Sequence, residues 1–172
     1  RHNKDVKVTD LLIGLVEAVT YRKDYQELIS QILERFLQIE RELNIRHSLI
    51  ETFRTQLNDY IMRYQDQPER LTDALKSCGE DFNAQLIASY NNEQGIMTTY
   101  LSPGDIGLIV SDEPSNAIVL EESYEKIKNN LAHAEGKVFI PGFFGVNKNG
   151  DINTFSRGGS DITGAIIASS LS

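Results

Sequence analysis

A short stretch near the end of the chain, INTFSRGGSD at residues 152–161, combines residue types that bind anions. Arg157 carries a planar guanidinium that can meet a carboxylate or a phosphate with two hydrogen bonds. Gly158 and Gly159 have no Cβ atom, so the backbone can approach a ligand closely at these positions. A helix that begins here also presents unpaired amides and about half a positive charge at its N-terminus. The stretch therefore predicts a site for a small anion at the start of a helix.

The same stretch also fits an ordinary turn followed by a helix cap. In that interpretation Ser160 is the N-cap, the two glycines make the bend, and Arg157 lies in solvent. Alternatively, Ser160 binds the ligand. The carboxylate of Asp161 then either interacts favourably with the positive N-terminus of the helix or pairs with a substrate ammonium. The motif is neither a Walker loop nor a dinucleotide-binding fingerprint, so by itself it leaves both interpretations open.

The first half of the chain has the apolar spacing of amphipathic helices. The predicted helices cover residues 8–19, 25–43 and 47–64, a segment from Pro68 onwards, and residues 80–91. Thr9 is the expected N-cap of the first helix, and Gly79 separates the last two. Because the breaks between these helices interrupt any heptad repeat, we expect a packed α-helical lobe at about residues 20–78 rather than a coiled coil.

The second half alternates between strand and helix signals. Strands are predicted at residues 96–101, 106–110, 137–146 and 152–155, and helices at residues 120–136 and 161–171. The apolar run IGLIV at residues 106–110 is typical of a buried parallel strand. Pro141 and Gly142 in the middle of the third strand require a bulge or a close backbone approach, and Asn149-Gly150 predicts a hairpin turn. This alternation indicates a layered α/β domain that carries the helical lobe.

The composition of the whole chain narrows the classes of protein. A net charge of −8 argues against a general nucleic-acid-binding protein, because phosphate contacts need a positive surface. The same charge favours a soluble, cytoplasmic protein. No stretch approaches the roughly 20 apolar residues that a membrane span needs. Cys78, the single cysteine, is expected in the core and excludes an intrachain disulfide. The basic start RHNK is expected to be a solvated loop, and His2, His47 and His133 lack the spacing of a metal-binding pair.

Three segments together resemble a known family. The stretch FIPGFFGVNKNGDINTFSRGGSD closely resembles the signature of aspartokinases, in the amino-acid kinase family. KVTDLLI at residues 7–13 and GEDFNAQLIASY at residues 79–90 are similar to two further substrate-binding segments of that family. The resemblance spans nearly the whole chain and implies a partial, three-layer amino-acid kinase-like α/β fold over residues 1–172. The lobe at about residues 20–78 then corresponds to the helical insertion of bacterial members.

The resemblance implies roles for three residues around the substrate. Arg157 matches the arginine that binds the α-carboxylate of aspartate, and Glu80 matches the acid that accepts the substrate ammonium. Thr9 matches a threonine that lines the substrate side of the site. Ordinary structural roles remain open for two of them: Glu80 also fits a first-turn glutamate favoured by the helix dipole, and Thr9 also fits a simple N-cap.

Four more residues match positions of the family's site. Phe143 matches the aromatic residue beside the substrate, although a buried strand residue at this position is also a plausible part of the core. Asp161 matches the catalytic aspartate close to the reacting groups, where we expect it to orient them and tune their electrostatics. Ser160 and Thr154 are weaker matches on the substrate side.

The implied reaction transfers the γ-phosphoryl group of ATP, with Mg²⁺, to the β-carboxylate of L-aspartate and gives 4-phospho-L-aspartate for lysine, threonine and methionine biosynthesis. The K-x-GG strand that carries the family's catalytic lysine is not among these residues, and neither are the nucleotide-binding segment and the regulatory ACT domains. We therefore expect the 172 residues to be a fragment that is inactive alone. We also expect homo-oligomers, because strand edges left without neighbours tend to pair.

Two other interpretations stay open. The first is another amino-acid kinase that acts on glutamate, acetylglutamate or carbamate; it is disfavoured because PGFFG, RGGSD and the helical insertion together match the aspartate branch best. The second is a non-catalytic interaction module built on the helical lobe. A kinase would bring Arg157, Glu80 and Thr9 around one pocket of amino-acid size, whereas a module has no need for that arrangement.

Overall fold

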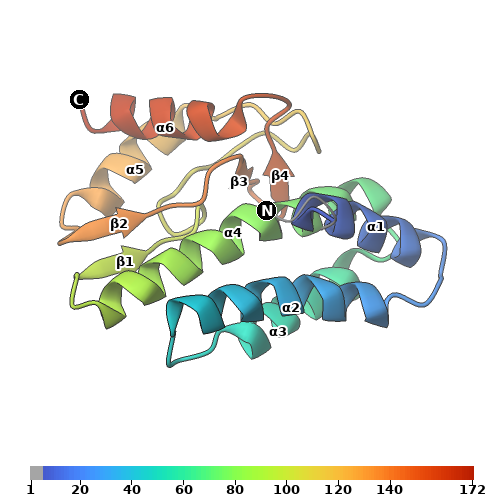
Figure 1. Cartoon of the computed structure of the whole chain (residues 1–172). Helices are drawn as coiled ribbons and strands as arrows, with labels where there is room; N and C mark the ends of the chain where they lie inside the picture. The colour runs from blue at the N-terminus through green and yellow to red at the C-terminus, as the bar shows by residue number, and fades with distance from the viewer. Residues whose placement is uncertain (1–5) are drawn as a thin grey trace. The chain divides into compact units, whose positions relative to one another are not determined.

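The computed structural model describes residues 6–172, which form two compact units (Figure 1). Unit 1 runs to Gly79 and is helical, and unit 2 comprises Glu80–Ser172 and contains both helices and strands. The predicted loop RHNK and His2 lie outside the described residues. Within residues 6–172, no helix combines the length and the apolar character that crossing a bilayer requires.

Unit 1 is built from three helices and the first part of a fourth. These elements are α1 (Val8–Thr20), α2 (Gln26–Leu43), α3 (Ile50–Tyr64) and α4 (Pro68–Glu93). Their apolar faces are buried, and the rings of Phe36 on α2 and Phe53 on α3 meet edge to face with centroids 5.5 Å apart. Such aromatic pairs contribute about 0.5–1.5 kcal/mol beyond the area they bury. The predicted lobe of residues 20–78 lies within this unit.

Two helix boundaries in unit 1 differ from the prediction. The N-cap of α1 is Lys7, whose backbone is extended, so the predicted N-cap role of Thr9 is wrong and Thr9 lies in the first turn. Helix α4 runs unbroken through Gly79, where two helices were expected. A single glycine costs a helix only about 1 kcal/mol, and the buried neighbours Cys78 and Phe82 hold the backbone helical on both sides.

A buried carboxylate sets the start of α3. Glu40 near the end of α2 is 3% exposed; its two oxygens accept hydrogen bonds from the Leu49 amide and the Ser48 hydroxyl, each 2.7 Å long. The carboxylate satisfies a backbone donor at the N-terminus of α3, where a negative charge is favourable. Because Ser48 and Leu49 are fixed in this way outside the helix, α3 begins at Ile50 rather than at the predicted His47.

Unit 2 contains two small sheets. Strand β1 (Thr98–Tyr100) pairs in parallel with β2 (Lys137–Phe139), and β3 (Phe144–Val146) pairs antiparallel with β4 (Ile152–Thr154). The helices of this unit are the rest of α4, α5 (Glu122–Leu131) and α6 (Gly159–Ser170), which packs beside α5 (Figure 1). The core consists of Ile106, Leu108, Val110, Ala117, Ile127, Phe155 and Ile166.

The segment KVFIPGFFGV forms two strands in different sheets, so the prediction of a single strand is wrong. The close backbone approach that was the alternative to a bulge is present at Gly142, beside Ser160. Pro141 and Gly142 end the first strand, and Phe143 then takes a left-handed backbone with a φ of 84°. The hairpin predicted at residues 147–151 is confirmed. Gly150 has a φ of 78°, and its amide donates to the carbonyl of Asn147 over 3.0 Å.

The apolar run IGLIV is buried as predicted but is not a regular strand. Ile109 forms a single parallel bridge with Val146, and Val110 forms a single antiparallel bridge with Val119. On α5, the Ser123 hydroxyl accepts from the Ile109 amide over 2.9 Å and donates to the Ile109 carbonyl over 2.7 Å. The Ser123 side chain therefore bonds to backbone groups of Ile109 that a neighbouring strand would otherwise pair with. The pairing of this segment with Val146 is limited to one residue.

The predicted helix at residues 120–136 ends earlier, at Leu131. Gly136, the last residue of the predicted range, lies outside the helix, where we had expected it to form the cap; this residue has a φ of 73° and starts the approach of β2 to β1. A Cβ atom at Gly136 would lie 2.5 Å from the carbonyl oxygen of Met97, so no other residue fits this contact without a shift. The glycine is therefore required by strand pairing and not by a helix cap.

Candidate functional site

A cavity of about 310 Å³ in unit 2 contains two of the predicted site residues, Glu80 and Ser160. Three elements form its walls: the part of α4 after Gly79, the end of β2 with the turn that follows it, and α6. Its lining residues are Glu80, Asn83, Ala84, Ile87, Phe139, Ile140, Pro141, Gly142, Ser160, Thr163, Gly164 and Ile167. The cavity thus has apolar walls, with a carboxylate on one helix and a hydroxyl near the N-terminus of another.

The start of α6 has the geometry of an anion site. Its N-cap is Gly158, in the left-handed region with a φ of 60°, and no side chain caps the helix. The predicted N-cap role of Ser160 is therefore wrong, because the helix begins one residue before it. With Gly158 at the cap, the first-turn amides have no side-chain acceptor and can donate to a ligand.

The turn after β2 packs directly against this helix start. A Cβ atom on Gly142 would lie 2.8 Å from the Cα atom of Ser160, and one on Gly159 would lie 2.8 Å from the Cα atom of Phe143. Both glycines are therefore required by close backbone contact. Phe143 itself adopts a positive φ, which a bulky residue keeps only where its surroundings impose it, and such strain gathers at functional sites.

The other predicted residues of unit 2 do not line this cavity. Arg157 and Asp161 are exposed on either side of the two glycines, Phe143 is half-buried, and Thr154 is buried in β4. Arg157 is the only arginine in the sequence after Arg70. Among residues 6–172 its guanidinium has no ion-pair or hydrogen-bond partner, so it is available to an anion.

Thr9 lies in unit 1, and the structure places it in a separate cavity of about 450 Å³. That cavity lies between the start of α1 and the second half of α2, and its other lining residues include Lys7, Arg35 and Glu42. The structure thus brings Glu80 and Ser160 together within unit 2. Arg157 does not line the cavity of Glu80, and Thr9 lies in unit 1, so the predicted convergence of Arg157, Glu80 and Thr9 around one pocket stays a prediction.

A buried hydrogen-bond network anchors α4 beside Glu80. The Tyr100 hydroxyl on β1 donates to one oxygen of Asp81, and the Gln85 side chain donates to the other over 3.2 Å. Asp81 is 4% exposed, so these bonds are needed to satisfy its carboxylate. They fix the turn of α4 that carries Glu80 against β1. The alternation of apolar and polar residues gave no signal for this pair, because its members are 19 residues apart.

A group of charged side chains around Glu122 lies outside the cavity. Hydrogen bonds and ion pairs with Lys126, at 2.7 Å, and Lys148, at 3.0 Å, lower the pKa of Glu122 on α5. No three His, Cys, Asp or Glu side chains in the described part of the chain come together as a metal site. Magnesium is commonly held by one or two carboxylates plus substrate phosphates, so a Mg²⁺ site does not require such a cluster.

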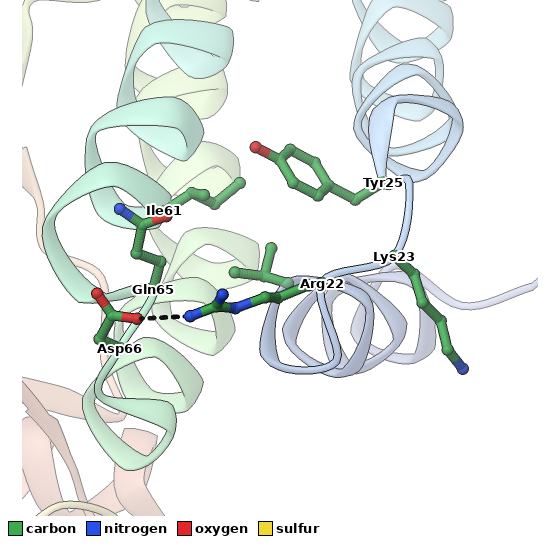
Figure 2. Close-up of a pocket in the computed structure, with 7 residues that line it drawn as sticks. Arg22, Lys23, Tyr25, Ile61, Gln65 and Asp66 are labelled. Atoms are coloured by element: carbon green, nitrogen blue, oxygen red, sulfur yellow. Dashed lines mark ion pairs between the residues drawn. The ribbon is translucent and has the colours of Figure 1, made fainter.

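Unit 1 has a second cavity, of about 500 Å³, at the junction of α1 and α2 with the end of α3 (Figure 2). Val19 and Ile61 are apolar, and Arg22 reaches across to Asp66, with nitrogen and oxygen 3.8 Å apart. Both charged side chains are at least 80% exposed, so their attraction is largely screened. Tyr25 also borders the cavity. The charged side chains that line it are exposed, so the described residues do not form a buried polar binding site there.

The backbone at Arg22 is unusual. The Arg22 amide donates to Val19 and the Lys23 amide to Ala18, which is the hydrogen-bond pattern of a helix end that normally has glycine in the left-handed position. Arg22 occupies that position with a φ of 54°. An arginine with a Cβ atom therefore stores strain where glycine would not.

We expect Arg22→Gly to raise the free energy of unfolding by about 0.5–1 kcal/mol, because glycine adopts this φ freely and the lost ion pair is exposed. Arg22→Ala is the matched control: it removes the same ion pair but keeps the Cβ atom, and should change stability by less than about 0.5 kcal/mol. Urea unfolding of both variants measures the difference. Equal stability of the two variants would show that the backbone at this position is unstrained.

Almost the whole chain is similar to known proteins. A sequence model of the amino acid kinase family matches residues 16–172. The chain is 44% identical over 168 residues to aspartokinase 3 of Bacillus subtilis. This alignment covers 98% of the chain and 37% of the Bacillus protein. It is 31% identical over 153 residues to the chloroplastic aspartokinase 1 of Arabidopsis thaliana, covering 84% of this chain and 27% of that protein. The chain thus spans about a third of the length of these relatives.

Two solved structures have a similar fold. The aspartate kinase of Clostridium acetobutylicum matches 99% of this chain and 36% of its own, with a TM-score of 0.71 and 32% identity. Aspartokinase III of Escherichia coli, in complex with aspartate and ADP, matches 97% of this chain and 38% of its own, with a TM-score of 0.70 and 23% identity. At that lower identity the second likeness shows the fold alone.

Proposed function

Because the chain belongs to the amino acid kinase family, we propose that the protein containing it is an aspartate kinase. The enzyme transfers the γ-phosphoryl group of ATP to the β-carboxylate of L-aspartate and releases 4-phospho-L-aspartate and ADP. The observation that carries this proposal is the similarity of nearly the whole chain to a bacterial aspartokinase. The proposal concerns the protein that contains these residues, and we propose no turnover by the 172 residues alone.

Within the proposed site, the residues of unit 2 bind the amino-acid end of the substrate. The free guanidinium of Arg157 and the uncapped amides of α6 bind the α-carboxylate, since both are donors that favour negative charge. Glu80 accepts the substrate ammonium from the opposite wall of the 310 Å³ cavity that it shares with Ser160. Phe143 provides an apolar side, and Asp161 in the first turn of α6 orients the reacting groups.

The chemistry asks little of these residues beyond alignment. The β-carboxylate of aspartate is already ionised at neutral pH, so no general base is needed to activate it. Phosphoryl transfer depends mainly on holding the attacking oxygen in line with the phosphorus and on neutralising the charge between them. Mg²⁺ bound with ATP would supply part of that neutralisation, and the residues described here do not provide its cage.

The direct test is product formation by the protein that contains this chain. Purified enzyme is incubated with ATP, hydroxylamine and one amino acid, because hydroxylamine traps an acyl phosphate as a coloured hydroxamate. L-Aspartate is expected to give hydroxamate, and L-glutamate and N-acetylglutamate are not. Product with glutamate or acetylglutamate instead would assign another amino-acid kinase, and product with none would favour the interaction module.

Glu80→Gln tests the ammonium-binding role. The glutamine keeps the shape and one acceptor oxygen but loses the charge, so the KM for aspartate should rise roughly 5- to 30-fold, with the loss limited by the exposure of this position. Glu125→Gln, an equally exposed change on α5, is the matched control and should leave the KM within twofold. Steady-state kinetics at saturating ATP give both values. The first-turn interpretation of Glu80 is wrong, because α4 begins at Pro68. An unchanged KM in Glu80→Gln would leave Glu80 as an exposed mid-helix residue with no role in substrate binding.

A further inference from the structure

The hydroxyl of Thr163 links two segments at the mouth of the proposed site. Thr163 lies on α6, is 3% exposed and lines the 310 Å³ cavity. Its Oγ1 donates to the carbonyl of Gly159, 2.9 Å away, and accepts a hydrogen bond from the amide of Phe143, 3.2 Å away. One hydroxyl therefore joins the first turn of α6 to the turn that follows β2.

The first of these bonds is common and the second is not. Threonine in a helix often donates to the carbonyl four residues earlier, as Thr55 does with Glu51 over 2.9 Å. The acceptor lone pair of Thr163, in contrast, is used by an amide 20 residues away in the sequence. The bond to Phe143 thus ties together two pieces of chain that helix geometry alone would not connect.

The peptide groups of Phe143 are held from both sides. Its amide donates to Thr163, and its carbonyl accepts from the Phe155 amide over 2.9 Å. This pairing offsets the cost of the left-handed backbone, whose φ is 84°. Close contact at Gly142 and Gly159 prevents the two segments from moving closer together.

We propose that Thr163 is a positioning residue for the reaction of this site, an inference that rests on the proposed aspartate kinase activity. The single hydroxyl proton is used by Gly159 and one oxygen lone pair by the Phe143 amide, so the role we assign to Thr163 is exerted through these two partners. It fixes the Phe143 ring and the first turn of α6, with Ser160, at one separation. Without the hydroxyl, the half-buried Phe143 amide loses its acceptor, and the turn shifts relative to the helix.

The test compares three substitutions in the protein that contains this chain. Thr163→Val keeps the shape and removes the hydroxyl, whereas Thr163→Ser keeps the hydroxyl and removes a methyl group. For Thr163→Val we expect the KM for aspartate to rise about 10-fold, from the loss of one buried hydrogen bond, with the KM for ATP within twofold. Thr163→Ser should stay within threefold of the parent. Thr55→Val, which loses only a bond to its own helix, should match the parent.

A second measurement keeps the inference testable when activity is lost. Hydrogen exchange of the Phe143 amide should be faster in Thr163→Val than in the parent, and unchanged in Thr163→Ser. If the valine variant does not fold, Thr163→Ala, which suits a helix better, replaces it in both measurements.

The outcomes separate the two proposals. Equal damage by valine and serine would overturn the positioning role and assign the effect to packing of the methyl group, and parent-like kinetics in Thr163→Val would also overturn it. If the parent makes no aspartyl product, the proposed function fails. In that case the exchange of the Phe143 amide still decides whether the hydroxyl holds the turn.

Discussion

Replacement of Arg157 with alanine should lower kcat/KM for aspartate by about 30- to 1,000-fold, equivalent to roughly 2–4 kcal/mol of transition-state stabilisation. The guanidinium is exposed, has no partner among residues 6–172, and stands next to the uncapped start of α6. No other arginine follows Arg70 in the sequence, so none from this part of the chain replaces it. The measurement is steady-state kinetics on the protein that contains the chain, with aspartate varied at saturating ATP.

Two further variants make the Arg157 result specific. Arg157→Lys keeps the charge but loses the planar fork, so it should recover only part of the activity. Arg41→Ala removes an exposed arginine on α2 that pairs with Glu34 over 3.1 Å, and should leave kcat/KM within twofold. A loss below threefold in Arg157→Ala would remove this residue from the substrate site.

Substitution of Gly159 with alanine should destabilise the protein by about 2–3 kcal/mol, within the range for overpacking a tight contact. The added Cβ atom would lie 2.8 Å from the Cα atom of Phe143 and 2.9 Å from its ring. Because the nearer atom belongs to the backbone, the turn after β2 must move for the methyl group to fit. The midpoint of urea unfolding gives the change in free energy.

Gly164→Ala, one turn further along α6, is the matched control. A Cβ atom there meets nothing within 4 Å, and alanine favours a helix over glycine by about 1 kcal/mol. The control should therefore be as stable as the parent or more stable, while Gly159→Ala unfolds at lower urea. Equal midpoints for the two variants would show that the close contact at Gly159 relaxes without cost.

Elements with their own local pattern could be predicted from the sequence. The helix expected at residues 25–43 is present as α2, and the Asn149-Gly150 turn joins β3 to β4. Elements whose ends depend on residues distant in the sequence could not be predicted in this way. The run IGLIV stops being a strand because Ser123 bonds to Ile109, and α3 starts late because Glu40 holds Leu49. In each case the deciding partner is nine or more residues away.

The α/β class and the amino acid kinase fold predicted from the motifs are confirmed. The site itself was only partly accessible to the sequence. The RGGSD motif located the start of α6, but its cap is the left-handed Gly158 and not Ser160. Thr163 gave no signal, because its bond to Phe143 spans 20 residues and follows no periodic pattern. The homo-oligomeric state and the cytoplasmic location stay predictions.

The bond between Ser123 and Ile109 gives unit 2 a built-in probe. The Ile109 amide proton is shielded by a hydroxyl on α5, so its replacement by deuterium tracks how often α5 lifts from the segment beneath it. Helix α5 packs beside α6, whose first turn forms the proposed anion site. The exchange rate of the Ile109 amide therefore reports on the rigidity of the helices that support the site. It can be followed at a position that touches no substrate.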